Sequence, residues 1–155
     1  MEGLSHLDDQ GRAHMVDVGD KPVTAREAVA EALITLSAEA RNALLGGGLA
    51  KGDAWAVARI AAIQGVKRTS EMVPLCHPIP ITGVEVDLSG TPDGARIQVT
   101  VRTTGPTGVE MEAITGAALG AVTIYDMVKG IDRGAEIGPI RLLAKSGGRS
   151  GEWRR

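Results

Sequence analysis

The sequence predicts an α+β fold in which helices pack on one face of an antiparallel sheet. Residues 81–89 and 97–101 alternate apolar with polar side chains, and the turn-forming residues 92–94 lie between them, which indicates a hairpin. A long helix over 109–128 and a final strand over 140–144 follow. Two strands, a helix and a strand, after strand-like and helical pieces in the first half, favour this layered class.

The first half of the chain leaves two interpretations open. A capping-box spacing over 24–27 and the composition of 25–32 would suit a helix. The run 33–36 is strand-like, however, and Ser37 could cap a separate helix that ends at the glycines 46–48. We favour a strand followed by a helix.

A second helix is predicted over Ala54–Gln64. Asp53 is a suitable N-cap, and Gly65 would stop the helix. The prolines that follow exclude a continuous helix in the next segment, which is therefore a loop: Pro74, Pro78 and Pro80.

The chain of 155 residues is long enough for one domain. We expect an N-terminal arm at 1–22, a single α+β catalytic domain at 23–146 and a flexible, Gly-rich and basic tail at 147–155. The chain has two Trp, one Tyr and no Phe, so its core consists of small aliphatic side chains that bury little area each. Additional burial between subunits would help, which suggests a homo-oligomer.

Charge and composition exclude several classes of function. A net charge of −2 argues against a nucleic-acid partner, which usually selects a basic surface. The longest apolar run, 113–125, is shorter than the roughly 20 residues of a membrane span, and the first 30 residues lack the apolar core of a signal peptide. Cys76 is the single cysteine, which favours a reducing compartment and hence the cytoplasm.

Three places could carry chemistry, and Lys51 is the first. It follows a Gly-rich run that lacks the P-loop spacing, but it lies just before a predicted helix N-terminus, where an anion is favoured. The alternative is a solvated lysine beside the capping Asp53.

The second place is the pair Cys76 and His77, held between Pro74 and Pro78. A histidine there could exchange protons near neutral pH. Structural zinc is not predicted, because there is no second cysteine and the other histidines lie in the arm. A nucleophilic Cys76, or a buried thiol beside a hydrogen-bonded histidine, are the alternatives.

The third place is the long helix, which carries Glu110 and Glu112 at its start and Asp126 and Lys129 at its end. An acid beside a lysine suits proton transfer around a phosphorylated substrate, although capping acids and a surface ion pair would look the same. Glu110 and Asp126 are 16 residues apart, so a straight helix separates them by roughly 24 Å. One substrate would reach both ends only at an interface between subunits.

Several ordered motifs together resemble the cyclic pyranopterin monophosphate synthase family, over about residues 6–151. The matching segments are His14-Met15-Val16-Asp17-Val18, Lys51-Gly52-Asp53, Lys67-Arg68-Thr69, Pro74-Leu75-Cys76-His77-Pro78, Gly108-Val109-Glu110-Met111-Glu112-Ala113, Thr123-Ile124-Tyr125-Asp126-Met127, Ile137-Gly138-Pro139 and Leu143-Ala144-Lys145-Ser146-Gly147-Gly148.

This resemblance implies a ferredoxin-like fold, a strand over 25–35, and a hexamer built as a trimer of dimers. It implies a lyase of molybdenum cofactor biosynthesis. The substrate would be (8S)-3′,8-cyclo-7,8-dihydroguanosine 5′-triphosphate, and the products cyclic pyranopterin monophosphate and diphosphate.

The resemblance also implies residue roles. Catalysis would fall on Lys51, Asp126 and Lys129. Substrate binding would fall on Leu75, Cys76, His77, Glu110, Met111, Glu112, Arg26, Lys67 and Lys145.

No metal site or cofactor is expected, although Mg²⁺ could assist the triphosphate. The expected partners are the phosphorylated small molecule and further copies of the chain, with no nucleic acid and no membrane. The alternatives are a non-catalytic, oligomeric nucleotide-binding regulatory module, or a structural scaffold without a ligand.

Overall fold

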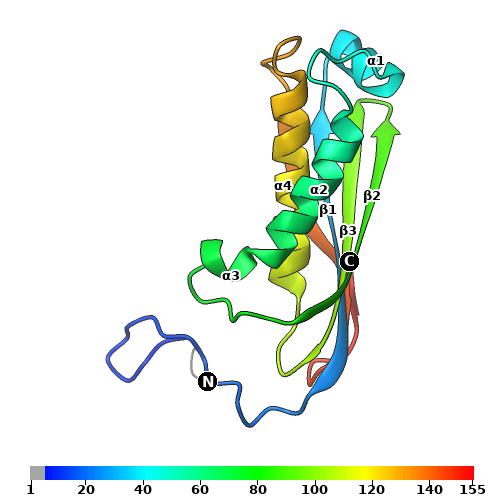
Figure 1. Ribbon diagram of the computed structural model, residues 1–155. Helices are drawn as coiled ribbons and strands as arrows, with labels where there is room; N and C mark the ends of the chain where they lie inside the picture. Colours follow the sequence, from blue (N-terminus) through cyan, green and yellow to red (C-terminus); the bar gives the residue numbers. More distant parts are fainter. Residues whose placement is uncertain (1–5) are drawn as a thin grey trace.

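A computed structural model describes residues 6–155 and shows a five-stranded antiparallel sheet (Figure 1). The strand order is β2-β3-β1-β4-β5. The strands are β1 (Thr24–Thr35), β2 (Ile81–Thr91), β3 (Gly94–Gly105), β4 (Glu136–Ser146) and β5 (Trp153–Arg154).

Four helices accompany the sheet, and Figure 1 shows α2 and α4 side by side in front of it. The helices are α1 (Ala38–Gly46), α2 (Ala54–Lys67), α3 (Thr69–Met72) and α4 (Glu110–Val128). The α+β prediction is confirmed. The strand-helix-strand-strand-helix-strand connectivity of β1 to β4, with β3 and β1 in the middle, is the one called ferredoxin-like.

The preference for a strand and then a helix in the first half is confirmed. Strand β1 pairs with β3 on one side and β4 on the other, and its residues Ala28, Ala30 and Ala32 are fully buried under the helices. This burial overrides the helical propensity of the alanines. The Ser37 hydroxyl accepts from the Ala40 N–H to cap α1, and Gly47, in the left-handed conformation, ends it.

The predicted helix stop at Gly65 is wrong, because α2 continues to Lys67. Gly65 is buried against α4, where an added Cβ would lie 3.1 Å from a methyl carbon of Leu119. The glycine therefore permits close helix packing and does not end the helix. The short helix α3 lies in a segment for which no helix was predicted.

Helix α4 meets the length and composition criteria of a membrane span, with a mean hydropathy of 1.2 in its most apolar window. Half of that window is buried within the fold, against β1, β3 and α2. Gly116 and Gly120 face these neighbours at close range. Its apolar character is that of a core helix.

The two ends of the chain differ in how they relate to the sheet. Within the expected tail, β5 pairs with β4, and the Arg155 N–H donates to Leu143 O at 2.9 Å. This strand was not predicted. Of the expected arm, residues 1–5 lie outside the described residues, and the remainder extends beyond the lower end of β1 (Figure 1) and contains a bridge between Leu7 and Ala13.

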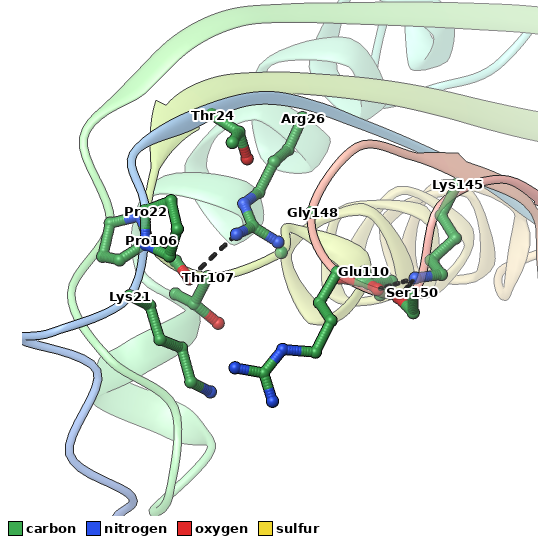
Figure 2. A pocket seen from close by; sticks show the side chains of 12 residues that line it. Lys21, Pro22, Thr24, Arg26, Pro106, Thr107, Glu110, Lys145, Gly148 and Ser150 are labelled. Atoms are coloured by element: carbon green, nitrogen blue, oxygen red, sulfur yellow. Dashed lines mark hydrogen bonds and ion pairs between the residues drawn. The ribbon is translucent and has the colours of Figure 1, made fainter.

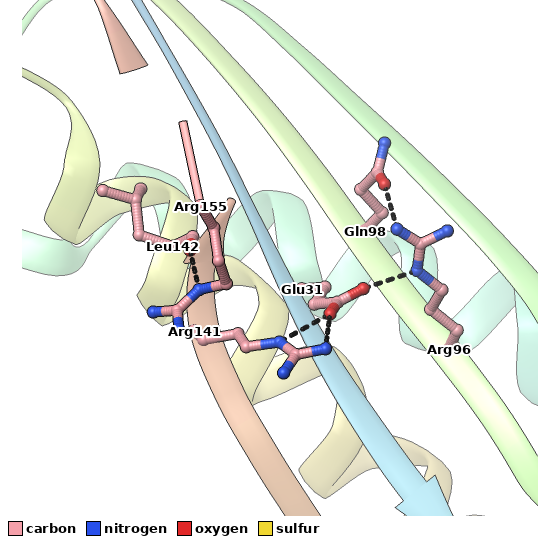
Figure 3. Close-up of polar contacts among 6 residues, drawn as sticks. All are labelled: Glu31, Arg96, Gln98, Arg141, Leu142 and Arg155. Atoms are coloured by element: carbon pink, nitrogen blue, oxygen red, sulfur yellow. Dashed lines mark hydrogen bonds and ion pairs between the residues drawn. The ribbon is translucent and has the colours of Figure 1, made fainter. Parts of the chain in front are cut away.

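The sheet face away from the helices carries charged side chains. Glu31, only 5% exposed, accepts from Arg96 at 2.7 Å and from Arg141 at 2.8 Å (Figure 3). Burial raises the pKa of Glu31, but the hydrogen bonds from Arg141 and Arg96 outweigh it and lower the pKa below its usual value. The three strands β3, β1 and β4 are thus linked by an ionised cluster.

Candidate active site

Lys51 and Lys129 converge on the carboxylate of Asp126. The Lys51 Nζ lies 2.8 Å from Oδ2, and the Lys129 Nζ lies 2.7 Å from Oδ1. Lys51 also donates to the backbone oxygen of Asp126 at 2.8 Å. Each of the three side chains is about half exposed. The arrangement leaves the cationic groups accessible to a ligand from solvent.

The local structure explains how these three residues meet. Asp53 caps α2 by accepting from the Ala56 N–H at 3.0 Å, which places Lys51 at the N-terminal end of that helix. Asp126 lies in the last turn of α4, and Lys129 is its C-cap. Helices α2 and α4 pack together, so the start of one lies beside the end of the other.

Asp126 is held strongly in its ionised form. Hydrogen bonds from Lys129 and Lys51 lower its pKa to about 2. A carboxylate with so low a pKa is a weak proton acceptor near neutral pH. In this structure the Asp126 carboxylate holds two ammonium groups close together.

A second cluster surrounds a cavity of about 370 Å³ at the start of α4. The loop between α3 and β2 and the first turn of α4 meet there, so residues more than 30 positions apart line one cavity. Six of the predicted substrate-binding residues are brought together: Leu75, Cys76, His77, Glu110, Met111 and Glu112.

The N-terminal arm orients His77 in this cavity. The His77 Nε2 lies 2.7 Å from Val16 O. A carbonyl oxygen only accepts, so Nε2 carries a proton, and in the neutral ring Nδ1 is the acceptor. Val16 and Val18 of the arm also line the cavity.

Glu112 is the buried acid of this cavity, with 3% of its surface exposed. Burial raises its pKa to about 7, and the neighbouring Glu110 carboxylate adds to the rise. Burial, and next the charge of Glu112, raise the pKa of the Cys76 thiol. Cys76 is thus kept as a thiol, which argues against the nucleophilic alternative.

A larger cavity of about 730 Å³ adjoins the cavity around His77 and Glu112, because Lys21, Thr107, Gly108 and Glu110 line both (Figure 2). Among residues 6–155, four cationic side chains but only one carboxylate line it. The cations are Lys21, Arg26, Lys145 and Arg149, and the carboxylate is Glu110. In a chain with a net charge of −2, such a cavity is suited to a polyanion.

Residues 15–148 match the model of the MoaC family. The chain belongs to this family. Three relatives, each named cyclic pyranopterin monophosphate synthase, come from Cereibacter sphaeroides strains KD131, ATCC 17023 and ATCC 17029. Each is 52% identical over 155 residues, covering 99% of this chain and 98% of the relative. The predicted membership of a family of lyases, and with it the prediction of an enzyme, is confirmed.

Within this MoaC-family chain, the predicted site residues fall into two groups at opposite ends of α4. Asp126 and Glu112 lie 14 residues apart, roughly 21 Å along the helix. Lys67, at the C-terminal end of α2, lines neither of the two cavities at the start of α4. A single copy of the chain does not unite the two groups.

Two cationic cavity residues, Lys21 and Arg149, were not among the predicted site residues. Both lie in segments that the sequence assigns to the arm and the tail, without periodicity. Their basic character was the only available signal. As for metals, no three His, Cys, Asp or Glu side chains gather as potential ligands anywhere in residues 6–155.

Proposed function

We propose that the chain converts (8S)-3′,8-cyclo-7,8-dihydroguanosine 5′-triphosphate to cyclic pyranopterin monophosphate, with release of diphosphate, in molybdenum cofactor biosynthesis. The observation that carries the proposal is the convergence of Lys51 and Lys129 on Asp126 in a member of the MoaC family. The names of the relatives support the product.

The rearrangement needs protons moved at several atoms, and Lys51 and Lys129 are the proposed donors and acceptors. Both ammonium groups lie within 2.8 Å of the same carboxylate, so the two lysines can reach one bound substrate. The low pKa of Asp126 favours a holding role for this residue over that of a general base.

The two adjoining cavities would bind the two halves of the substrate. The cationic cavity suits the triphosphate, and Arg26 and Lys145 would stabilise the negative charge that grows as diphosphate leaves. The cavity with His77 and Glu112 suits the ring system, because it presents both proton donors and acceptors.

The complete site requires two copies of the chain. The lysine pair and the cavity with His77 and Glu112 lie roughly 21 Å apart along α4, which is too far for one small substrate. A neighbouring subunit would bring the opposite end of its own α4, and the proposed assembly is a hexamer built as a trimer of dimers. Light scattering after size exclusion tests this, and a fully active monomer would contradict it.

The direct experiment is incubation with the cyclised GTP substrate while diphosphate and a fluorescent pterin derivative are measured. We expect Lys51→Ala and Lys129→Ala each to lower turnover by about 10²–10⁴-fold, the usual effect of losing an acid–base group, with the oligomer intact. Arg133→Ala is the control, because this exposed cation lies four residues beyond Lys129 and lines neither cavity. Retained turnover in either lysine variant removes that residue from the mechanism.

Two further properties stay predictions. The cytoplasmic location rests on the single cysteine and awaits fractionation of cells. Assistance by Mg²⁺ would show as a loss of turnover in a chelator that added Mg²⁺ restores.

A further inference from the structure

The loop after β4 forms one wall of the cationic cavity. Its residues Gly147 and Gly148 have φ of +87° and +73°, a region that side chains disfavour. A Cβ on Gly147 would overlap the backbone of Ala25, and a Cβ on Gly148 would overlap the guanidinium of Arg26. The loop therefore lies directly against β1, and the next residue, Arg149, lines the cavity.

The cations of this cavity differ in how far they are already engaged. Arg26 donates to Gly105 O at 2.9 Å and to Pro106 O at 3.0 Å. Lys145 bonds the Ser150 hydroxyl and lies 3.9 Å from Glu110 (Figure 2). The Arg149 guanidinium is exposed and, within residues 6–155, has no carboxylate at ion-pair distance. Arg149 thus keeps its full set of donors for a ligand.

We propose that Arg149 is a specificity-determining residue that binds the polyphosphate of the substrate and lets the site prefer a triphosphate to a monophosphate. This rests on the proposed function. The planar guanidinium can donate two parallel hydrogen bonds to a phosphate, which a lysine cannot do. The two glycines allow the loop to approach β1, and Arg149 then lines the same cavity as Arg26 and Lys21.

The first test compares Arg149→Gln with Arg154→Gln, a matched loss of one charge on β5, outside the cationic cavity. GTP, GMP and inorganic triphosphate are the probes, titrated by calorimetry at one ionic strength. We expect Arg149→Gln to weaken GTP and triphosphate binding about tenfold, as for a charged hydrogen bond at an exposed site, and GMP binding less. Arg154→Gln should stay within about twofold. With the cyclised substrate, KM should rise while kcat changes little.

The second test keeps every charge and disturbs the contact between the loop and Arg26. Gly148→Ala should weaken GTP binding as much as Arg149→Gln, because its Cβ displaces Arg26 or the loop. Gly151→Ala is the control, since Gly151 has a comparable φ of +64° but an added Cβ there meets nothing within 4 Å. Circular dichroism and thermal melts verify that both variants fold.

The outcomes separate this inference from the proposed function. Unchanged GTP and triphosphate binding in Arg149→Gln, in a protein that turns over the cyclised substrate, overturns the inference. An equal loss in Arg154→Gln also overturns it, because the effect would then be one of net charge. If the wild-type protein shows no turnover but Arg149→Gln still loses triphosphate binding, the proposed function fails and the role of Arg149 stands.

Discussion

At the scale of single residues, two carboxylates of one helix have very different pKa values. Two ammonium groups keep Asp126 ionised, with a pKa of about 2, whereas burial keeps Glu112 close to half protonated at neutral pH, with a pKa of about 7. Pairs of acids with such different pKa values are typical of sites that move protons. Glu112 can donate a hydrogen bond at a pH where Asp126 only accepts.

The raised pKa of Glu112 predicts how stability depends on pH. The carboxyl has an ordinary pKa of 4.5 when unfolded and about 7 when folded, so the folded state holds the proton more tightly. Its contribution to the free energy of unfolding is present below pH 4.5 and is lost as the pH rises through 7. Above that pH the buried charge costs on the order of 3 kcal/mol. Glu112→Gln removes this cost. The stability of the variant relative to the wild type should therefore be higher at pH 8 than at pH 5 by about that amount.

Urea unfolding of the wild type and Glu112→Gln at pH 5 and pH 8 measures the difference. Glu39→Gln, an exposed acid in the first turn of α1, is the control and should leave the pH dependence unchanged. If wild type and Glu112→Gln lose stability in parallel between the two pH values, Glu112 is not the titrating group.

At the scale of elements, α2 and α4 approach each other through glycines. A Cβ on Gly116 would lie 2.6 Å from a Val66 methyl carbon and 3.1 Å from Ala62 O, and one on Gly65 would lie 3.1 Å from Leu119. The close approach positions the lysine pair, because Lys51 lies just before α2 and reaches Asp126 at the end of α4. Small residues on the helices thus shape the candidate site at their ends.

Gly116→Val is therefore expected to destabilise the fold. The added methyl groups have no room against Val66 and the α2 backbone, and overpacking of this kind costs about 1–3 kcal/mol. For a chain of this size the melting temperature should fall by roughly 3–10 °C. Ala118→Val, at a half-exposed position of the same helix, adds the same branched side chain and should shift the melting temperature by no more than about 2–3 °C. Equal shifts would contradict tight packing at Gly116.

At the scale of the whole molecule, the two ends of α4 carry different parts of one proposed site. Figure 1 shows α4 lying along the sheet, with α1 near the end of this helix and α3 nearer its start. The lysine pair lies at the end of α4, and His77 and Glu112 lie at its start. Assembly of two copies would unite these parts, and the small aliphatic core also favours burial between subunits.

Subunit complementation tests this arrangement. Lys51→Ala and His77→Ala should each be inactive alone, because each damages a different half of every site. After the two variants are unfolded, mixed and refolded together, mixed pairs contain one intact site and one doubly damaged site. We expect turnover to recover to about a quarter of the wild-type value for random pairing of two copies. Mixing without recovery, when each variant alone forms the native oligomer, would place the whole site within one chain.

The amino-acid sequence by itself determined the elements whose signals are local. Pro92-Asp93-Gly94 between alternating runs predicted the hairpin, Ser37 and Asp53 predicted helix starts, and the apolar run predicted α4 to within a residue at its start. The family also followed from the sequence, because its motifs are short and ordered along the chain.

Only the tertiary structure decided what depends on contacts between distant segments. Gly65 lies inside α2 and leaves room for Leu119 of α4 to pack against it. An alanine-rich segment becomes β1 because β3 and β4 pair with its two edges. Lys21 and Arg149 meet in one cavity although 128 positions separate them in the sequence. Burial and charge pairing, which set the pKa values of Glu112 and Asp126, arise only once the chain has folded.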